Sequence, residues 1–265
     1  MLARILRILT FRADHEDFLS LDGRHLGVGL FVTWLVGIGR YWDNPRVELL
    51  QKAGVGSVVY VFLLAVLLWL LGLGLKPRRW SYVNLLTFIT LTAPPGLLYA
   101  IPVERFLSSD GARTANLAFL AVVAAWRVAL YGLYLRRYAA LSAAPLVVQL
   151  LLPLTLIVSG LAVLNLERAV FDVMGGVEET TSADTAYAVL VLLTLLSLYL
   201  SPVLVGAYVV IAALRWRSRV AGAEPLNGSA GSLSEPAHDA QVEQDEGGKG
   251  EDGRGRAEPR GSLHS

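Results

Sequence analysis

The sequence has no cysteine and little charge, and each absence excludes some classes of protein. Without cysteine there is no disulfide, no thiolate nucleophile, no iron–sulfur cluster and no thiolate zinc site. Charged residues make up only 17% of the 265 residues, whereas hydrophobic residues make up 54%. A soluble domain usually carries about 25% charged residues. This composition excludes an ordinary soluble globule, and it excludes disorder as the main state because disorder requires low hydrophobicity.

Six stretches come near the length of about 20 apolar residues that a bilayer core of roughly 30 Å requires. They are 26–41, 53–75, 81–101, 115–135, 145–166 and 186–214. Every backbone amide in lipid must be bonded internally, so these stretches are expected to be helices. The alternating pattern of a membrane barrel is absent. The fold class predicted for 26–214 is therefore an all-α, polytopic transmembrane helical bundle of about six spans.

The connections between these stretches carry unequal numbers of Lys and Arg. The N-terminal segment, the second and fourth connections and the segment after the last stretch together hold twelve of these residues. The first, third and fifth connections hold six. Cytoplasmic loops are enriched in Lys and Arg, so both termini are predicted to be cytoplasmic. If 26–41 does not span, the termini lie on opposite sides. Arginine outnumbers lysine 20 to 3, which indicates a GC-rich bacterial genome.

The two ends of the chain differ from the apolar body. Apolar residues recur at helical spacing among arginines over 2–9. Residues 1–25 are therefore predicted to form a cytoplasmic segment with a short interfacial helix, and an unstructured basic start is the alternative. Residues 215–265 are predicted to be a disordered, cytoplasmic acidic tail, because 221–265 hold 9 acidic and 4 basic residues and no Phe, Trp or Tyr. The tail is either an interaction surface or a dispensable solvated terminus.

Arg127 is the one charged residue near the middle of a predicted span. An arginine at that depth costs at least about 2.5 kcal/mol, so its side chain should face protein or a wet cavity. One hypothesis is an anion-binding residue inside the bundle. The other is structural, with Arg127 donating to carbonyls freed where Pro94–Pro95 break a neighbouring helix. No Asp or Glu lies within the predicted apolar cores, which argues against a carrier that uses a buried carboxylate.

Other polar residues enter the apolar stretches, among them Asn84 and Gln149. Such residues usually bridge helices at about 0.6 kcal/mol each, so interhelical bonding is expected, with a substrate pathway as the alternative. Ala121, Ala125 and Ala129 form a row of small residues that predicts a closely packed helix face. The candidate intramembrane polar site, functional or structural, consists of Arg127, Asn84, Pro94, Pro95 and Gln149.

A faint internal repeat divides the apolar body into two halves. FLSLDG (18–23) precedes the first stretch and FLSSDG (106–111) precedes the fourth. Each half would have three crossings, so the halves would be inverted. Each half also ends in a stretch that contains proline, at Pro94–Pro95 and at Pro202. Inverted halves with broken helices in matching places are typical of transporters.

No catalytic motif is present. The chain has no phosphate-binding glycine loop, nucleophile elbow or kinase signature. The acidic run DHED (14–17) lacks the spacing of a metal site, so solvated charges are expected there. We expect no enzyme activity, no catalytic residue, no cofactor, no metal and no nucleic-acid partner.

The stretches GRYWDNP (39–45), SYVNLLTFITLTAPPGLLYAIPVERF (81–106) and NLERAVFDVMGG (165–176) resemble uncharacterised multi-pass inner-membrane proteins of bacteria. The resemblance covers roughly residues 15–215. In size and in its bundle of about five helices with a cytoplasmic N-terminus, the chain is also distantly similar to Yip-type membrane proteins. Both resemblances imply a multi-pass membrane fold, and neither implies an activity or a functional residue.

Two functions are compatible with these features. The first is a non-enzymatic membrane organising or accessory protein, whose partners are membrane lipids and other membrane proteins. The second is a small transporter or a lipid- or anion-handling protein built from two inverted three-helix halves. The second function would give Arg127 a small anionic ligand.

Overall fold

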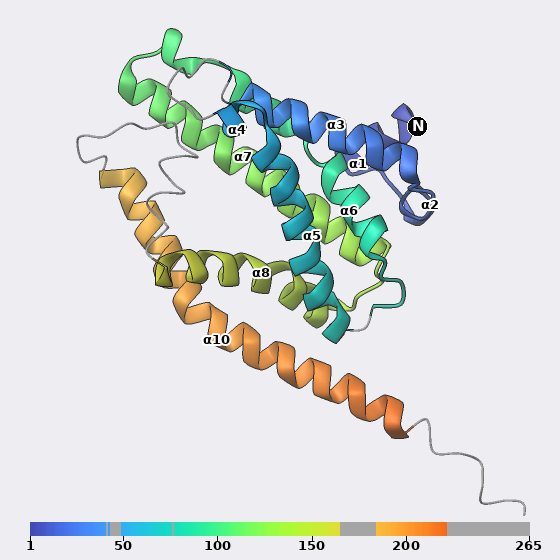
Figure 1. The fold of residues 1–265 in the computed structure, drawn as a ribbon. Coiled ribbons are helices and arrows are strands. Elements are labelled where there is room, and N and C mark those ends of the chain that lie inside the picture. Colours follow the sequence, from blue (N-terminus) through green and yellow to red (C-terminus); the bar gives the residue numbers. More distant parts are fainter. Residues whose placement is uncertain (41, 43–48, 76, 165–183, 222–265) are drawn as a thin grey trace, which may run out of the picture. The chain divides into compact units, whose positions relative to one another are not determined.

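The computed structural model describes residues 1–40, 42, 49–75, 77–164 and 184–221, and every regular element in these ranges is a helix (Figure 1). The predicted span ends at 41 and at 165–166, and the predicted tail beyond Ala221, lie outside the described residues. The helices in chain order are α1 (Leu2–Leu9), α2 (His15–Leu19), α3 (Gly23–Gly39), α4 (Leu49–Lys52), α5 (Val55–Leu75), α6 (Tyr82–Leu91), the 3-10 helices η1 (Pro94–Ala100) and η2 (Val103–Arg105), α7 (Ser109–Arg137), α8 (Ala143–Val163) and α10 (Asp184–Ala221).

Four of these helices are long and apolar enough to cross a membrane. They are α5, α7, α8 and the Val191–Arg217 part of α10. The pair Tyr82–Leu91 and Pro94–Arg105, bent by 42°, makes a fifth crossing if it counts as one span. The predicted all-α fold is thus confirmed for the described residues, which include four or five candidate spans. The first predicted span corresponds to α3, whose 17 residues are fewer than in any of the four.

The proline-containing helices differ from one another. α6 ends at Leu91 and the chain continues as η1 from Pro94, because two consecutive prolines remove two backbone donors. The expectation that Pro202 also breaks its helix is wrong, since α10 is continuous from Asp184 to Ala221. In lipid a single proline is tolerated because breaking the helix would leave more backbone groups unbonded. The first residues of the predicted tail, 215–221, are also helical.

The N-terminal segment folds onto the bundle. Ile5 and Ile8 of α1 are buried, whereas Leu2 and Leu6 of the same helix are exposed. Residues 2–9 form a helix rather than an unstructured start. Its buried face belongs to the main apolar core, together with residues from α2, α5, α6 and α7.

Aromatic rings form the centre of that core. Tyr134 of α7 is fully buried, stacks on Phe88 of α6 with ring centroids 4.4 Å apart, and meets the edge of Phe18 of α2 at 5.5 Å. Such pairs contribute about 0.5–1.5 kcal/mol beyond the area they bury. α2 is thus held against α6 and α7 by ring packing.

α3 runs beside the broken helix in the same direction. Near its start, Gly29 lies against Thr90 of α6, and at its end Gly39 lies against Ala100 of η1. A Cβ at Gly29 would be 2.2 Å from Thr90 Oγ1 and 2.7 Å from its Cβ. Glycine is therefore required at 29 for the close approach of the two helices, and not for its backbone freedom.

Gly29→Ala should destabilise the protein by about 1–3 kcal/mol, because the added methyl group overpacks a closed contact. The matched control is Gly27→Ala on the same helix, where nothing lies within 4 Å of the added Cβ. Thermal unfolding of both variants in detergent measures the difference. Equal midpoints for the two variants would show that α3 does not pack on α6 in this register.

Candidate functional site

Arg127 meets the break between α6 and η1. Its Nε donates to the Thr92 carbonyl at 3.2 Å. In a continuous α-helix that carbonyl would accept from the amide of residue 96, but Gly96 N donates to Ala93 O instead, at 2.8 Å. The shift to a 3-10 helix at Pro94 therefore leaves the Thr92 carbonyl without its helical donor, and Arg127 supplies one.

Gly96 and Tyr99 of η1 lie near the Arg127 guanidinium. A Cβ at Gly96 would lie 3.5 Å from Arg127 Nη2 and 3.8 Å from Tyr99 Cδ2. The Arg40 guanidinium lies over the Tyr99 ring, 5.5 Å from its centroid. Arg40, Tyr60 and Tyr99 all interact electrostatically with Arg127. Arg40 and the two tyrosines could not be foreseen from the sequence as neighbours of Arg127, because only the packing of α3, α5 and η1 brings them together.

Asn84 lies in a different place, where α2, α6 and α7 meet. Its Nδ2 donates to the Phe18 carbonyl at 2.8 Å, and its Oδ1 accepts from the Tyr134 hydroxyl at 2.9 Å. One side chain thus bonds two neighbouring elements. This is the bridging arrangement expected of a polar residue inside a bundle.

Gln149 of α8 forms a third, separate contact. It is fully buried, and its Nε2 donates to the Leu68 carbonyl of α5 at 2.9 Å and to the Tyr131 hydroxyl of α7 at 3.0 Å. Its Oε1 has no partner in the described part of the chain. The structure therefore brings Arg127 together with Pro94 and Pro95, and it places Asn84 and Gln149 elsewhere.

Two other features of the spans concern how the helices contact one another. The Thr87 hydroxyl donates to Val83 O of its own helix at 2.7 Å rather than to a neighbouring helix, because a threonine in a helix readily bonds the preceding turn. Ala121, Ala125 and Ala129 are exposed. The predicted close-packing face of α7 is therefore not covered by any element that the structure describes.

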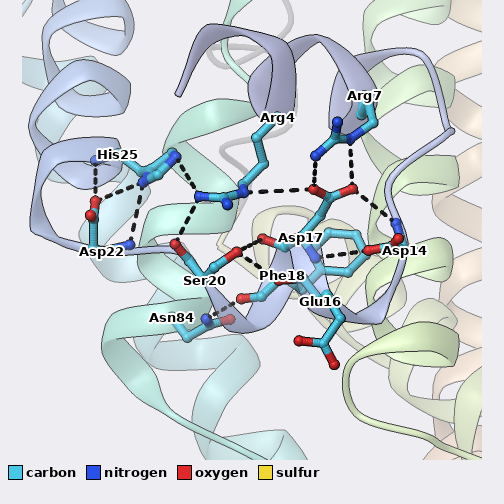
Figure 2. A network of polar contacts seen from close by, with 10 residues as sticks. All are labelled: Arg4, Arg7, Asp14, Glu16, Asp17, Phe18, Ser20, Asp22, His25 and Asn84. Atoms are coloured by element: carbon cyan, nitrogen blue, oxygen red, sulfur yellow. Dashed lines mark hydrogen bonds and ion pairs between the residues drawn. The ribbon is translucent and has the colours of Figure 1, made fainter. Parts of the chain in front are cut away.

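A charged network joins α1 to α2 and the start of α3 (Figure 2). Asp17 is only 3% exposed, and it accepts from Arg7 Nε at 2.9 Å and from Arg7 Nη2. Arg4 Nε lies 3.6 Å from the same carboxylate. Asp14 and Asp17 form a capping box at the N-terminus of α2. The expectation of solvated charges over 14–17 is wrong for Asp17.

Arg4 connects this carboxylate to α3. Its Nη1 donates to Ser20 O at 3.1 Å and lies 3.4 Å from His25 Nε2, while His25 Nδ1 lies 2.7 Å from Asp22 Oδ1. The spacing of Asp14 and Asp17 could have revealed the capping box. The ion pairs could not be foreseen, because they depend on α1 folding back over α2.

The network shifts the titration of its carboxyl groups. Hydrogen bonding to Arg7 holds the pKa of Asp17 below its ordinary value, against the opposing effect of burial. The hydrogen bond to His25 likewise lowers the pKa of Asp22. Across the described residues no group of three His, Asp or Glu side chains could hold a metal ion.

No protein-family model, curated protein or solved structure matches the chain. The resemblance to bacterial inner-membrane proteins and to Yip-type proteins stays a prediction.

Asp17→Asn should lower the free energy of unfolding by about 1–3 kcal/mol at pH 7, because Arg7 loses its charged acceptor. A carboxyl whose pKa is lowered by folding stabilises the protein above its unfolded pKa of about 3.9, and this contribution is lost as the pH falls through the folded value. The difference in the free energy of unfolding between wild type and Asp17→Asn should therefore become smaller below about pH 4. Thermal melts in detergent across pH measure it.

The exposed Glu16 of the same short helix provides the control, as Glu16→Gln removes a carboxylate that has no partner of this kind. Its melting temperature should match that of wild type at pH 7. A gap for Asp17→Asn that stays constant down to pH 3 would contradict the ion pair.

Proposed function

We propose that the chain is an integral protein of the bacterial inner membrane with both termini in the cytoplasm, and that it has a non-enzymatic organising or accessory role. The four or five apolar helices support a membrane location. The absence of a recognisable catalytic motif in the sequence supports a role other than catalysis.

Six spans are supported by the way α3 lies in the bundle. Its 17 residues extend about 26 Å, somewhat less than the roughly 30 Å of a bilayer core. The contacts of Gly29 and Gly39 follow the broken helix from α6 to the end of η1. We therefore count α3 as a short span and the broken helix as another.

The cytoplasmic orientation is supported by contacts that gather basic segments at one end. Arg78 N donates to Ala139 O at 3.3 Å, so the α5–α6 connection meets the α7–α8 connection. At the same end Arg137 donates to Ala13 O, which joins the N-terminal segment to the end of α7. Clustering of Arg on one side of the membrane favours that side as cytoplasmic.

Labelling of single cysteines can map this topology directly, because the chain has no native cysteine. With a membrane-impermeant maleimide on intact cells, Leu49→Cys and Leu107→Cys should react, whereas Arg12→Cys and Arg79→Cys should react only after permeabilisation. These four positions are exposed. Reaction of positions 12 and 49 from the same side would show that α3 does not cross the membrane.

The observation that carries the organising role is the exposed alanine row of α7. Ala121, Ala125 and Ala129 recur every fourth residue, so they lie on one face of the helix. Small residues at this spacing let two membrane helices approach closely. Since no described helix covers this face, we propose that a helix of another membrane protein packs there.

A photo-crosslinking amino acid at Ala125 should give a discrete protein adduct in cells. Ala121→Leu and Ala129→Leu should reduce that adduct by about tenfold, which corresponds to about 1.4 kcal/mol of association free energy. The control position is Tyr199 of α10, which is 78% exposed and should give lipid adducts. The proposal fails if Ala125 yields no protein adduct, or yields the same adducts as Tyr199.

Arg127 favours a second candidate, a small transporter or a lipid- or anion-handling protein built from two inverted halves. Its bond to Thr92 O engages Nε and leaves the two Nη groups for other acceptors. The repeated segments both precede a capped helix, with Asp22 capping α3 and Ser108 capping α7. Because α10 is continuous through Pro202, the two halves do not both end in a broken helix.

A further inference from the structure

We propose that α1 is a membrane-embedded helix, which lies within the cytoplasmic leaflet and presents Leu2 and Leu6 to the acyl chains of the lipids. Contacts to α7 and pairing of its arginines with Asp17 hold it at that depth. The inference rests on the proposed membrane location and orientation, because it uses α7 as a span whose C-terminal end is cytoplasmic.

The depth of α1 follows from its contact with α7. Trp126 Nε1 donates to the Leu9 carbonyl at 3.2 Å. Trp126 precedes Arg137, the last residue of α7, by 11 residues, which corresponds to about 16 Å along the helix axis. The end of α1 therefore lies beside the apolar part of α7 and not at its cytoplasmic end. The chain meets that end at Ala13, whose carbonyl accepts from Arg137.

The turn after α1 is built around the same contact. Arg12 N donates to Arg7 O at 2.8 Å. Phe11 N donates to Ile8 O at 3.1 Å, which completes the Schellman arrangement of a helix C-terminus. Phe11 occupies the left-handed position of this turn with a φ of 62°, where glycine is the usual residue. Its ring centroid lies 5.4 Å from that of Trp126, so the ring contact offsets an unfavourable backbone conformation.

The charged side chains of α1 have partners inside the protein. Both arginines extend from α1 toward α2, where Arg7 bonds the buried carboxylate of Asp17 and Arg4 Nε lies 3.6 Å from it (Figure 2). Arg4 Nη1 also donates to the Ser20 carbonyl at 3.1 Å. An arginine without a partner is costly in an apolar region. The shared carboxylate therefore allows a helix with two arginines to lie below the lipid headgroups.

The outward face of α1 is apolar. Leu2 and Leu6 are 68% and 53% exposed, and they share a face because they lie four residues apart. Ile5 and Ile8 pack into the core. At the depth set by Trp126 the surroundings of this outward face are hydrocarbon, so acyl chains cover it. Insertion of such a face between lipids is favourable through its apolar area alone.

The test uses the full-length protein in phosphatidylcholine vesicles, with a fluorophore on a single introduced cysteine. Leu6→Cys reports on α1, Leu63→Cys on the exposed side of the α5 span, and Glu16→Cys on the exposed side of α2. Phosphatidylcholine with brominated acyl chains should quench the labels at 6 and 63. Iodide on both sides of the membrane should quench the label at 16 and leave the other two bright.

The remaining outcomes overturn the proposal in distinguishable ways. If iodide quenches position 6 while brominated lipid quenches position 63, the protein is in the membrane but α1 lies in water. If iodide quenches both positions, the proposed membrane location fails and the inference fails with it. Protection of position 6 from both quenchers means that protein covers Leu6 in place of lipid.

Two variants of the Leu6→Cys protein test what holds α1 at its depth. Asp17→Asn removes the carboxylate shared by the two arginines, so α1 should move toward the water and lipid quenching should fall by about twofold or more. Phe11→Gly keeps the turn but removes the ring contact to Trp126, and should shift the label in the same direction. The control Glu16→Gln should leave the quenching unchanged. Unchanged quenching in Phe11→Gly overturns the proposal if Asp17→Asn is also unchanged or does not fold.

Discussion

The hydrogen bond from Arg127 to the Thr92 carbonyl allows the break between α6 and η1 inside an apolar helical bundle. A backbone carbonyl without a donor costs several kcal/mol in hydrocarbon, and the change from α6 to η1 at Pro94 creates one. Arg127 supplies the donor from the neighbouring helix. The same bond gives a partly buried arginine a fixed position. A proline break and an intramembrane charge, each unfavourable alone, therefore stabilise each other.

A second group of charged interactions lies where α1 and α2 pack against α6 and α7. Asp17 is buried because Arg7 and Arg4 neutralise it, and the ring of Phe18 next to it packs against Tyr134. Breaking a buried pair leaves one charge uncompensated, which costs more than the pair contributes. The arginines of α1 are thus occupied within the protein, and its exposed Leu2 and Leu6 are what it presents outward.

The sequence was sufficient to predict the helical fold, because long apolar runs can only be helices in lipid. The four single-helix candidate spans, α5, α7, α8 and α10, overlap the predicted stretches 53–75, 115–135, 145–166 and 186–214. The hydrogen bond from Arg127 to a carbonyl freed near Pro94–Pro95 could be predicted from the sequence as one of two hypotheses, because arginine and consecutive prolines are both rare inside a membrane. Three features could not be predicted. The burial of Asp17, the exposure of Ala125 and the approach of Tyr99 to Arg127 depend on which faces of the helices meet, and the pattern of apolar residues is nearly uniform around each span.

The most direct test of this account is a solid-state NMR measurement of the dipolar coupling between ¹⁵Nε of Arg127 and the ¹³C carbonyl of Thr92, with the protein in a lipid bilayer. The account predicts a coupling that corresponds to a hydrogen-bonded pair, in agreement with the 3.2 Å between Nε and O. Absence of a measurable coupling in a folded sample would contradict it, because Arg127 would then lie away from the break between α6 and η1.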